Sequence, residues 1–145
     1  MPIIKNIIFD LEGVLGYYEN SESLIFYDDV LELTSELIAD GYNLYYLTNV
    51  LNSSSKYFNQ FVTKILENEG FLGGLGSNNY PYSKPDKKFY KQLSSQYKIN
   101  PKESLFIDDK KSNTNSAKEL GFKVLFHSSK GKNLKEQVFN FINQS

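Results

Sequence analysis

The chain has 145 residues, of which 40% are hydrophobic and 23% are charged, a composition typical of one globular domain and not of a disordered or fibrous protein. With 16 basic and 17 acidic residues the net charge is -1, so no broad positive field favours nucleic acid or an anionic membrane. The absence of cysteine excludes disulfides, thiolate metal ligands and cysteine nucleophiles.

The first half of the chain predicts two units in which a strand precedes a helix. An isoleucine-rich run ends at Asp10 and Gly13, as a buried strand does where it enters a turn. Apolar residues then recur at helical spacing between Asp28 and Asp29, which we interpret as helix caps, and a stop at Gly41. The predicted order is a strand at 3–9, a helix at 30–38, a strand at 42–47 and a helix at 53–69.

The second half continues this alternation. It predicts a weak, glycine-containing strand at 71–76, a loop with Pro81 and Pro85, a helix at 86–97, a strand at 104–107, a helix at 114–120, a strand at 122–126 and a helix at 133–142. Alternating strands and helices favour a doubly wound, Rossmann-like α/β fold with a parallel five-stranded sheet and helices on both faces. We expect a single domain spanning 1–145.

The N-terminal residues bear on location. Residues 1–9 are apolar but too few to span a bilayer, and cleavage after a secretory signal would remove Asp10, which the chemistry below requires. We therefore expect a cytoplasmic protein with neither a membrane nor a nucleic acid as its partner.

Polar side chains follow four of the predicted strands, at the edge of the sheet where such folds bind ligands. They are Asp10 and Glu12, Thr48 and Asn49, Ser83 and Lys84, and Asp108 and Asp109. The set offers a carboxylate that can attack phosphorus, a hydroxyl, a cation and an acidic pair suited to Mg²⁺. It therefore predicts phosphoryl transfer.

Four segments, in order, resemble the motifs of the haloacid dehalogenase superfamily. They are FDLEGVL at 9–15, YLTN at 46–49, SKPDKKFY at 83–90, and LFIDDKKSN at 105–113 with AKELGF at 117–122. The resemblance covers most of the chain. It implies a magnesium-dependent phosphomonoester hydrolase that acts through an aspartyl-phosphate on a phosphorylated small molecule or phosphopeptide.

The resemblance also implies roles for individual residues in catalysis and phosphate binding. Asp10 would be the nucleophile that accepts the phosphoryl group. Thr48 and the Asn49 amide would hold phosphate oxygens, and Lys84 would neutralise charge on both the nucleophile and the phosphate. Glu12 stands where the family's phosphatases usually carry the aspartate that acts as general acid and base.

A metal site is implied as well. Mg²⁺ would bind the carboxylates of Asp10, Asp108 and Asp109 and the backbone carbonyl of Glu12. Asn113 stands where the family often has a polar residue that supports the acidic loop and the motif lysine.

Two features depart from the family pattern. Glu12 is one methylene longer than the usual aspartate, which brings into question its reach as an acid and base. Only residues 11–47 separate the first two motifs, and no helical cap domain fits there or between 50 and 83. We expect an open site, covered at most by a tyrosine-rich flap at 16–27, in which Tyr17, Tyr18 and Tyr27 either line a substrate entrance or pack the flap.

Three other functions use some of the same residues. A catalytically weak or inactive protein that binds phosphate and Mg²⁺ for regulation is the alternative if Glu12 marks a loss of turnover. Hydrolytic dehalogenation is disfavoured by the acidic pair and by the carboxylate at position 12. A phosphoacceptor receiver domain would have the acidic pair at the first strand and the acceptor later, the reverse of the order here.

His127, the only histidine, is expected to have a surface or packing role.

Overall fold

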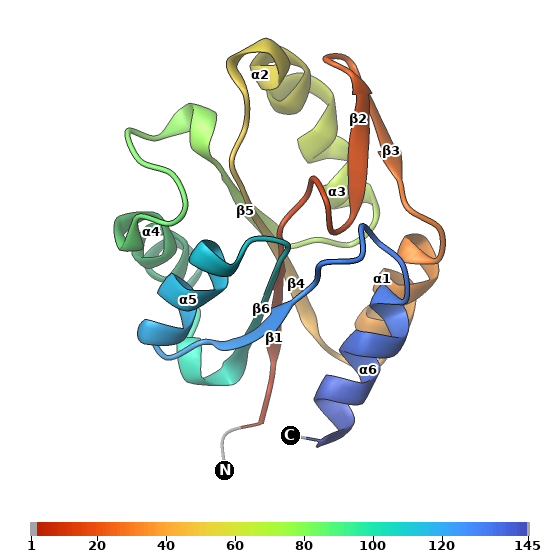
Figure 1. Ribbon diagram of the computed structural model, residues 1–145, viewed down its shortest axis with the longest axis vertical. Helices are drawn as coiled ribbons and strands as arrows, with labels where there is room; N and C mark the ends of the chain where they lie inside the picture. Colours follow the sequence, from red (N-terminus) through yellow and green to blue (C-terminus); the bar gives the residue numbers. More distant parts are fainter. Residues whose placement is uncertain (1–2, 145) are drawn as a thin grey trace.

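The computed structural model describes residues 3–144, and its parallel five-stranded sheet confirms the predicted doubly wound α/β fold (Figure 1). The strands are β1 (Asn6–Phe9), β4 (Asn43–Thr48), β5 (Gly73–Gly76), β6 (Ser104–Asp108) and β7 (Lys123–Phe126). They lie in the order β5-β4-β1-β6-β7, and every neighbouring pair is parallel. β1 is thus central, and the chain winds outward on either side of it, which places the ligand-binding edge at its carboxyl end. Residues 1, 2 and 145 of the expected domain lie outside the described range.

Helices cover both faces of the sheet (Figure 1). α1 (Val30–Ala39), α3 (Thr63–Asn68) and α6 (Leu134–Gln144) pack on one face, and α4 (Lys87–Tyr97) and α5 (Lys111–Glu119) pack on the other. Alternate residues of β1 serve the two cores: Ile7 and Phe9 join the first, and Ile8 joins the second. Between residues 3 and 144, no helix has the length and apolarity to cross a bilayer.

The helix after β6 begins earlier than the predicted start at 114. The Lys110 N–H donates to Asp108 Oδ1 over 3.0 Å, which turns the chain immediately after the strand and starts α5 at Lys111. As a result Asn113 lies in the first turn of the helix and not in the loop before it. The first strand, in turn, begins at Asn6 and not at position 3.

The helix predicted at 53–69 is not one regular α-helix. It consists of a 3₁₀ turn at Asn52–Ser54, α2 (Ser55–Tyr57), a π-helical turn at Phe58–Val62 and α3. The wider turn keeps both Phe58 and Val62 buried in the core. Before α1, Asp29 occupies the predicted cap position, but its φ of 67° is left-handed and its side chain makes no capping hydrogen bond.

An antiparallel hairpin lies beside the carboxyl edge of the sheet (Figure 1). It occupies most of the segment expected to be a flap at 16–27. Its strands are β2 (Gly16–Asn20) and β3 (Ser23–Phe26). The rings of Tyr17 and Tyr27 lie 5.5 Å apart and face the pocket described below, whereas Tyr18 packs edge-on against Tyr57 at 6.3 Å. Tyr17 and Tyr27 thus border the pocket, whereas Tyr18 packs the hairpin against the body of the protein.

Candidate functional site

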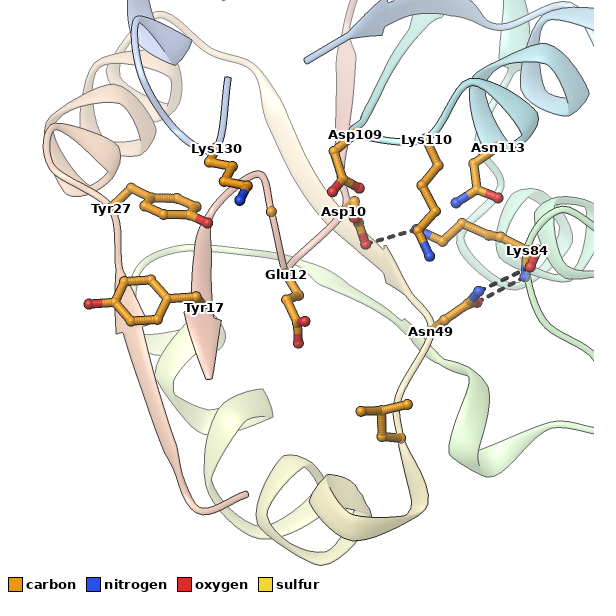
Figure 2. Close-up of a pocket in the computed structure, with 12 residues that line it drawn as sticks. Asp10, Glu12, Tyr17, Tyr27, Asn49, Lys84, Asp109, Lys110, Asn113 and Lys130 are labelled. Carbon is orange, nitrogen blue, oxygen red and sulfur yellow. Dashed lines mark hydrogen bonds and ion pairs between the residues drawn. The ribbon is translucent and has the colours of Figure 1, made fainter. Parts of the chain in front are cut away.

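A pocket of about 600 Å³ opens at the carboxyl ends of β1, β4 and β6. Most of the residues that line it lie on loops, while one comes from strand β2 and one from helix α5; they are Asp10, Glu12, Gly13, Tyr17, Tyr27, Asn49, Leu51, Lys84, Asp109, Lys110, Asn113 and Lys130 (Figure 2). Two of the residues expected at the site, Thr48 and Asp108, are buried and do not line the pocket wall. The Thr48 hydroxyl lies 3.5 Å from the carbonyl oxygen of Asn49.

Lys84 lies at the centre of the buried charges. Its ammonium donates to Asp10 Oδ1 over 2.8 Å, to Asp108 Oδ2 over 2.6 Å and to the Leu47 carbonyl oxygen over 2.8 Å. An ammonium has three donors, and all three are used. An anion in the pocket can therefore bind Lys84 Nζ only by replacing one of these partners. Burial alone would lower the pKa of Lys84, but the Asp10 and Asp108 carboxylates outweigh it and raise this pKa.

Three carboxylates converge beside this lysine. Asp10, Asp108 and Asp109 each place one oxygen so that the three atoms lie within 4.8 Å of one another. Burial raises the pKa of Asp10 to about 7, Lys84 opposes the shift, and the Asp108 and Asp109 carboxylates add to it. Burial and a hydrogen bond with Asp108 raise the pKa of Asp109 as well. Hard oxygen donors that repel one another until a cation joins them fit a divalent ion such as Mg²⁺.

The side chain of Asn49 fixes the backbone of Lys84. Its Nδ2 donates to the Lys84 carbonyl oxygen over 3.0 Å, and its Oδ1 accepts from the Lys84 N–H over 2.9 Å (Figure 2). This two-way contact joins the end of β4 to the loop that precedes α4. Asn49 lines the pocket, where a phosphate contact is expected for it, but its motif gives no sign of this contact with Lys84.

Asn113 supports the acidic loop from the first turn of α5. Its Nδ2 donates to Asp108 Oδ2 over 3.2 Å, the same oxygen that accepts from Lys84. Its carbonyl oxygen accepts from the Tyr90 hydroxyl over 2.7 Å, which ties this turn to α4. Asn113 thus contacts the acidic loop directly and Lys84 through Asp108.

The turn after β1 depends on Gly13. Its φ of +90° is left-handed, and a Cβ there would collide with the Asp109 carboxylate. This turn leaves Glu12 exposed on the pocket wall, and Figure 2 shows its carboxylate pointing away from Asp10 and Asp109. Within the part of the chain that the structure describes, the Glu12 side chain forms no hydrogen bond or ion pair.

Three lining residues, Leu51, Lys110 and Lys130, were not singled out from the sequence. Lys110 lies inside the fourth motif and Leu51 lies two residues after the second, so their positions in the chain could have indicated them. Lys130 gave no such signal, because it belongs to the loop between β7 and α6, far from every motif. Lys130 reaches the pocket wall because its loop packs against the Tyr27 ring in the folded protein.

His127 organises that loop. The buried imidazole accepts the Gly131 N–H at Nε2 over 2.7 Å, and its Nδ1 lies 2.8 Å from Gln137 Oε1. Because Nε2 accepts, Nδ1 carries the proton that is donated to Gln137. Of the two roles expected for His127, packing is therefore the one observed.

A family model described as haloacid dehalogenase-like hydrolase matches residues 14–127, a segment that begins after Asp10. A search of curated proteins found no match. A protein from Porphyromonas gingivalis, described as a predicted haloacid dehalogenase-like family hydrolase, has a TM-score of 0.78 at 17% identity, over 99% of this chain and 100% of that one.

Two further solved structures are similar. A haloacid dehalogenase family enzyme from Bacteroides thetaiotaomicron, in complex with magnesium and inorganic phosphate, has a TM-score of 0.70 at 19% identity, over 85% of this chain and 93% of that one. An uncharacterized protein from Corynebacterium glutamicum has a TM-score of 0.71 at 15% identity, over 97% of this chain and 93% of that one. At identities of 15–19%, it is the TM-scores that establish a shared fold.

Proposed function

The chain belongs to the haloacid dehalogenase-like hydrolases, and we propose that it is a magnesium-dependent phosphomonoester hydrolase with Asp10 as its nucleophile. The observation that carries this proposal is the environment of Asp10. Its carboxylate lies at the end of the central strand, borders the pocket, accepts from Lys84 over 2.8 Å and adjoins two further carboxylates. The magnesium and phosphate bound by the Bacteroides enzyme of the same fold support the assignment.

The donor set fits Mg²⁺. Asp10, Asp108 and Asp109 would supply carboxylate oxygens, and the backbone carbonyl of Glu12 would complete the protein's share. When bound, the ion would neutralise negative charge on the carboxylates and on phosphate oxygens.

Two steps follow for the residues of this chain. An oxygen of Asp10 attacks phosphorus, the ester P–O bond breaks, and the leaving oxygen takes a proton from Glu12. A water then attacks the aspartyl-phosphate and gives a proton to Glu12, and the P–O bond to Asp10 breaks to release inorganic phosphate. Thr48 and Lys84 would hold phosphate oxygens, for which Lys84 must exchange one of its three present partners and the buried Thr48 hydroxyl must become exposed to the pocket.

We further propose that the chain works as one domain without a separate cap, so the β2–β3 hairpin is the cover of its site. Tyr17, in β2, and Tyr27, directly after β3, support this, because both line the pocket. A hairpin is a smaller cover than a cap domain and leaves room for either a phosphorylated small molecule or a phosphopeptide.

Turnover of an activated aryl phosphate, with Mg²⁺ and with a chelator, tests the function. We expect phosphate release that depends on Mg²⁺. If no phosphate is released under either condition while Mg²⁺ still binds, the regulatory, weakly catalytic alternative replaces the hydrolase.

Magnesium should raise the melting temperature through the carboxylate cluster, because the ion binds the folded site and not the unfolded chain. We expect Asp109→Ala to remove that increase. Asp40→Ala, which changes an exposed carboxylate at the end of α1, is the matched control and should retain it. A magnesium-dependent shift that survives in Asp109→Ala would place the ion elsewhere.

Glu12 is the observation that keeps the weaker alternative open. Its carboxylate points away from Asp10, and a general acid must lie within hydrogen-bond reach of the leaving oxygen (Figure 2). We expect Glu12→Asp to raise turnover of an activated aryl phosphate several-fold, since misplacement by about 1 Å can cost about a hundredfold. Glu12→Gln should lower turnover. Magnesium affinity should change little in both variants, because the proposed metal contact is the backbone carbonyl.

Two other outcomes of these measurements have distinct meanings. If Glu12→Asp is slower than the native chain and Glu12→Gln is inactive, the site is adapted to glutamate and the misplacement argument is wrong. If neither substitution changes the rate, Glu12 has no acid-base role.

A further inference from the structure

A third lysine, Lys130, borders the pocket on the side opposite Lys84 and Lys110. Figure 2 shows Lys84, Asn49 and Lys110 on one side of the catalytic carboxylates, and Lys130 beside Tyr27 on the other. The proposed phosphate contacts all lie on the first side. Lys130 is therefore placed to meet the part of a substrate that leaves, and not the phosphoryl group that is transferred.

The loop that carries Lys130 is built to hold it there. The Gly131 N–H donates to the buried His127 ring over 2.7 Å, and the Ser129 hydroxyl donates to the Lys132 carbonyl oxygen over 2.7 Å. Gly131, at a φ of +80°, lies so close to the Tyr27 ring that a Cβ would collide with it. The loop and the hairpin thus form one continuous wall.

Lys130 itself adopts an unfavourable backbone conformation. Its φ of 51° is left-handed, which is uncommon for a residue with a side chain and is often found where function requires it. Among residues 3–144, no side chain or backbone group forms a hydrogen bond or ion pair with its ammonium. The wall therefore presents an unpaired positive charge to the pocket.

The size of the pocket leaves room for a ligand that reaches this charge. At about 600 Å³ it falls within the usual range of about 300–1,000 Å³ for small-molecule sites, well above the needs of one phosphate group. The rings of Tyr17 and Tyr27 line the path on the Lys130 side.

We propose that Lys130 binds a second anionic group of the substrate, so that this protein prefers organic phosphates whose leaving group carries a carboxylate or another negative charge. The inference rests on the proposed hydrolase function and adds the class of substrate to it. Lys130 acts as a specificity residue, and it takes no part in the transfer of the phosphoryl group.

Phosphonates test this without requiring turnover. Affinities of the magnesium-loaded protein are measured by calorimetry for phosphonocarboxylates with spacers of one to three methylenes, and for alkylphosphonates of the same lengths. We expect the best phosphonocarboxylate to bind at least about tenfold more tightly than its alkyl counterpart, the effect of one charge-assisted hydrogen bond. Lys130→Met should reduce this preference to within about twofold and leave alkylphosphonate affinity unchanged.

Lys132→Met is the matched control, because Lys132 is exposed on the same loop and does not line the pocket; it should keep the preference. A preference that survives in Lys130→Met would come from the metal or from Lys110 and overturns the inference, as does equal binding of both ligand classes by the native chain. These results leave the hydrolase intact if aryl phosphate is still turned over. Failure of every phosphonate to bind, without turnover, refutes the hydrolase and the inference together.

Discussion

Replacement of Asp10 by asparagine is expected to abolish phosphate release while the fold remains intact. The amide has nearly the same shape and keeps an oxygen that can accept from Lys84, so the contact seen at 2.8 Å can persist. An amide cannot, however, attack phosphorus, and it removes one negative ligand from the metal site. We expect a loss of several orders of magnitude in turnover of an aryl phosphate, as is typical when a nucleophile is removed.

The pKa of Asp10 adds a prediction about stability to this one. Because burial raises this pKa from 3.8 to about 7, the folded protein binds a proton more tightly here than the unfolded chain does. The contribution of Asp10 to stability is therefore greatest at low pH and is lost as the pH rises through about 7. Without Mg²⁺ at pH 8, Asp10→Asn should melt at the same temperature as the native chain or higher.

Asp28→Asn is the control for both measurements, since Asp28 is exposed and lies outside the pocket. It should change neither turnover nor the melting temperature. Turnover of Asp10→Asn within about tenfold of the native rate would remove Asp10 from the role of nucleophile.

The sheet could be predicted because its signals are local. The strands around Ile7 and Phe106 are buried on both faces and read as short apolar runs, and glycines such as Gly41 and Gly121 mark the helix ends. The hairpin is not part of the prediction, which gives the segment with Tyr17, Tyr18 and Ile25 as a flap. Aromatic and β-branched residues on either side of a polar turn are nevertheless typical of paired strands. The π-helical turn at 58–62 leaves no local signal.

The residues of the site likewise fall into two groups, those that local sequence signals predict and those that they do not. Residues that follow strands, such as Asp10, Lys84 and Asp109, were predictable because parallel strands bring their carboxyl ends to one edge. The function of the Asn49 side chain and the position of Lys130 could not be predicted. Both depend on contacts between segments that are distant in the sequence, Asn49 with Lys84 and Gly131 with the ring of Tyr27.

Replacement of Lys84 by methionine is expected to have the largest effect on stability. The Lys84 side chain is 1% exposed and pairs with Asp10 and Asp108, whose side chains are 9% and 0% exposed. Removal of one partner from such a group leaves uncompensated buried charge, which typically costs about 3–5 kcal/mol. For a domain of this size that is a fall in melting temperature of about 10–20 °C, measured without Mg²⁺ at pH 8. Turnover should be lost as well.

The matched control is Lys87→Met, three residues away. Lys87 pairs with Glu119 over 2.6 Å, but their side chains are 46% and 62% exposed, and exposed pairs contribute at most about 1 kcal/mol. A fall of similar size in both variants would mean that the loss comes from α4 and not from the buried charges.

Two conditions should restore part of the stability lost in Lys84→Met, and each reports on the carboxylates. Without the ammonium, the pKa of Asp10 rises further, so protonation of Asp10 at low pH relieves its repulsion with the neighbouring carboxylates. The gap in melting temperature to the native chain should therefore narrow from pH 8 toward pH 5. Magnesium should also raise the melting temperature of the variant more than that of the native chain, because the ion replaces the positive charge that the Lys84 ammonium supplied to these carboxylates. A gap that neither pH nor Mg²⁺ changes would show that Lys84 stabilises the fold through its packing, and that the charges at the end of β1 are not held by this lysine.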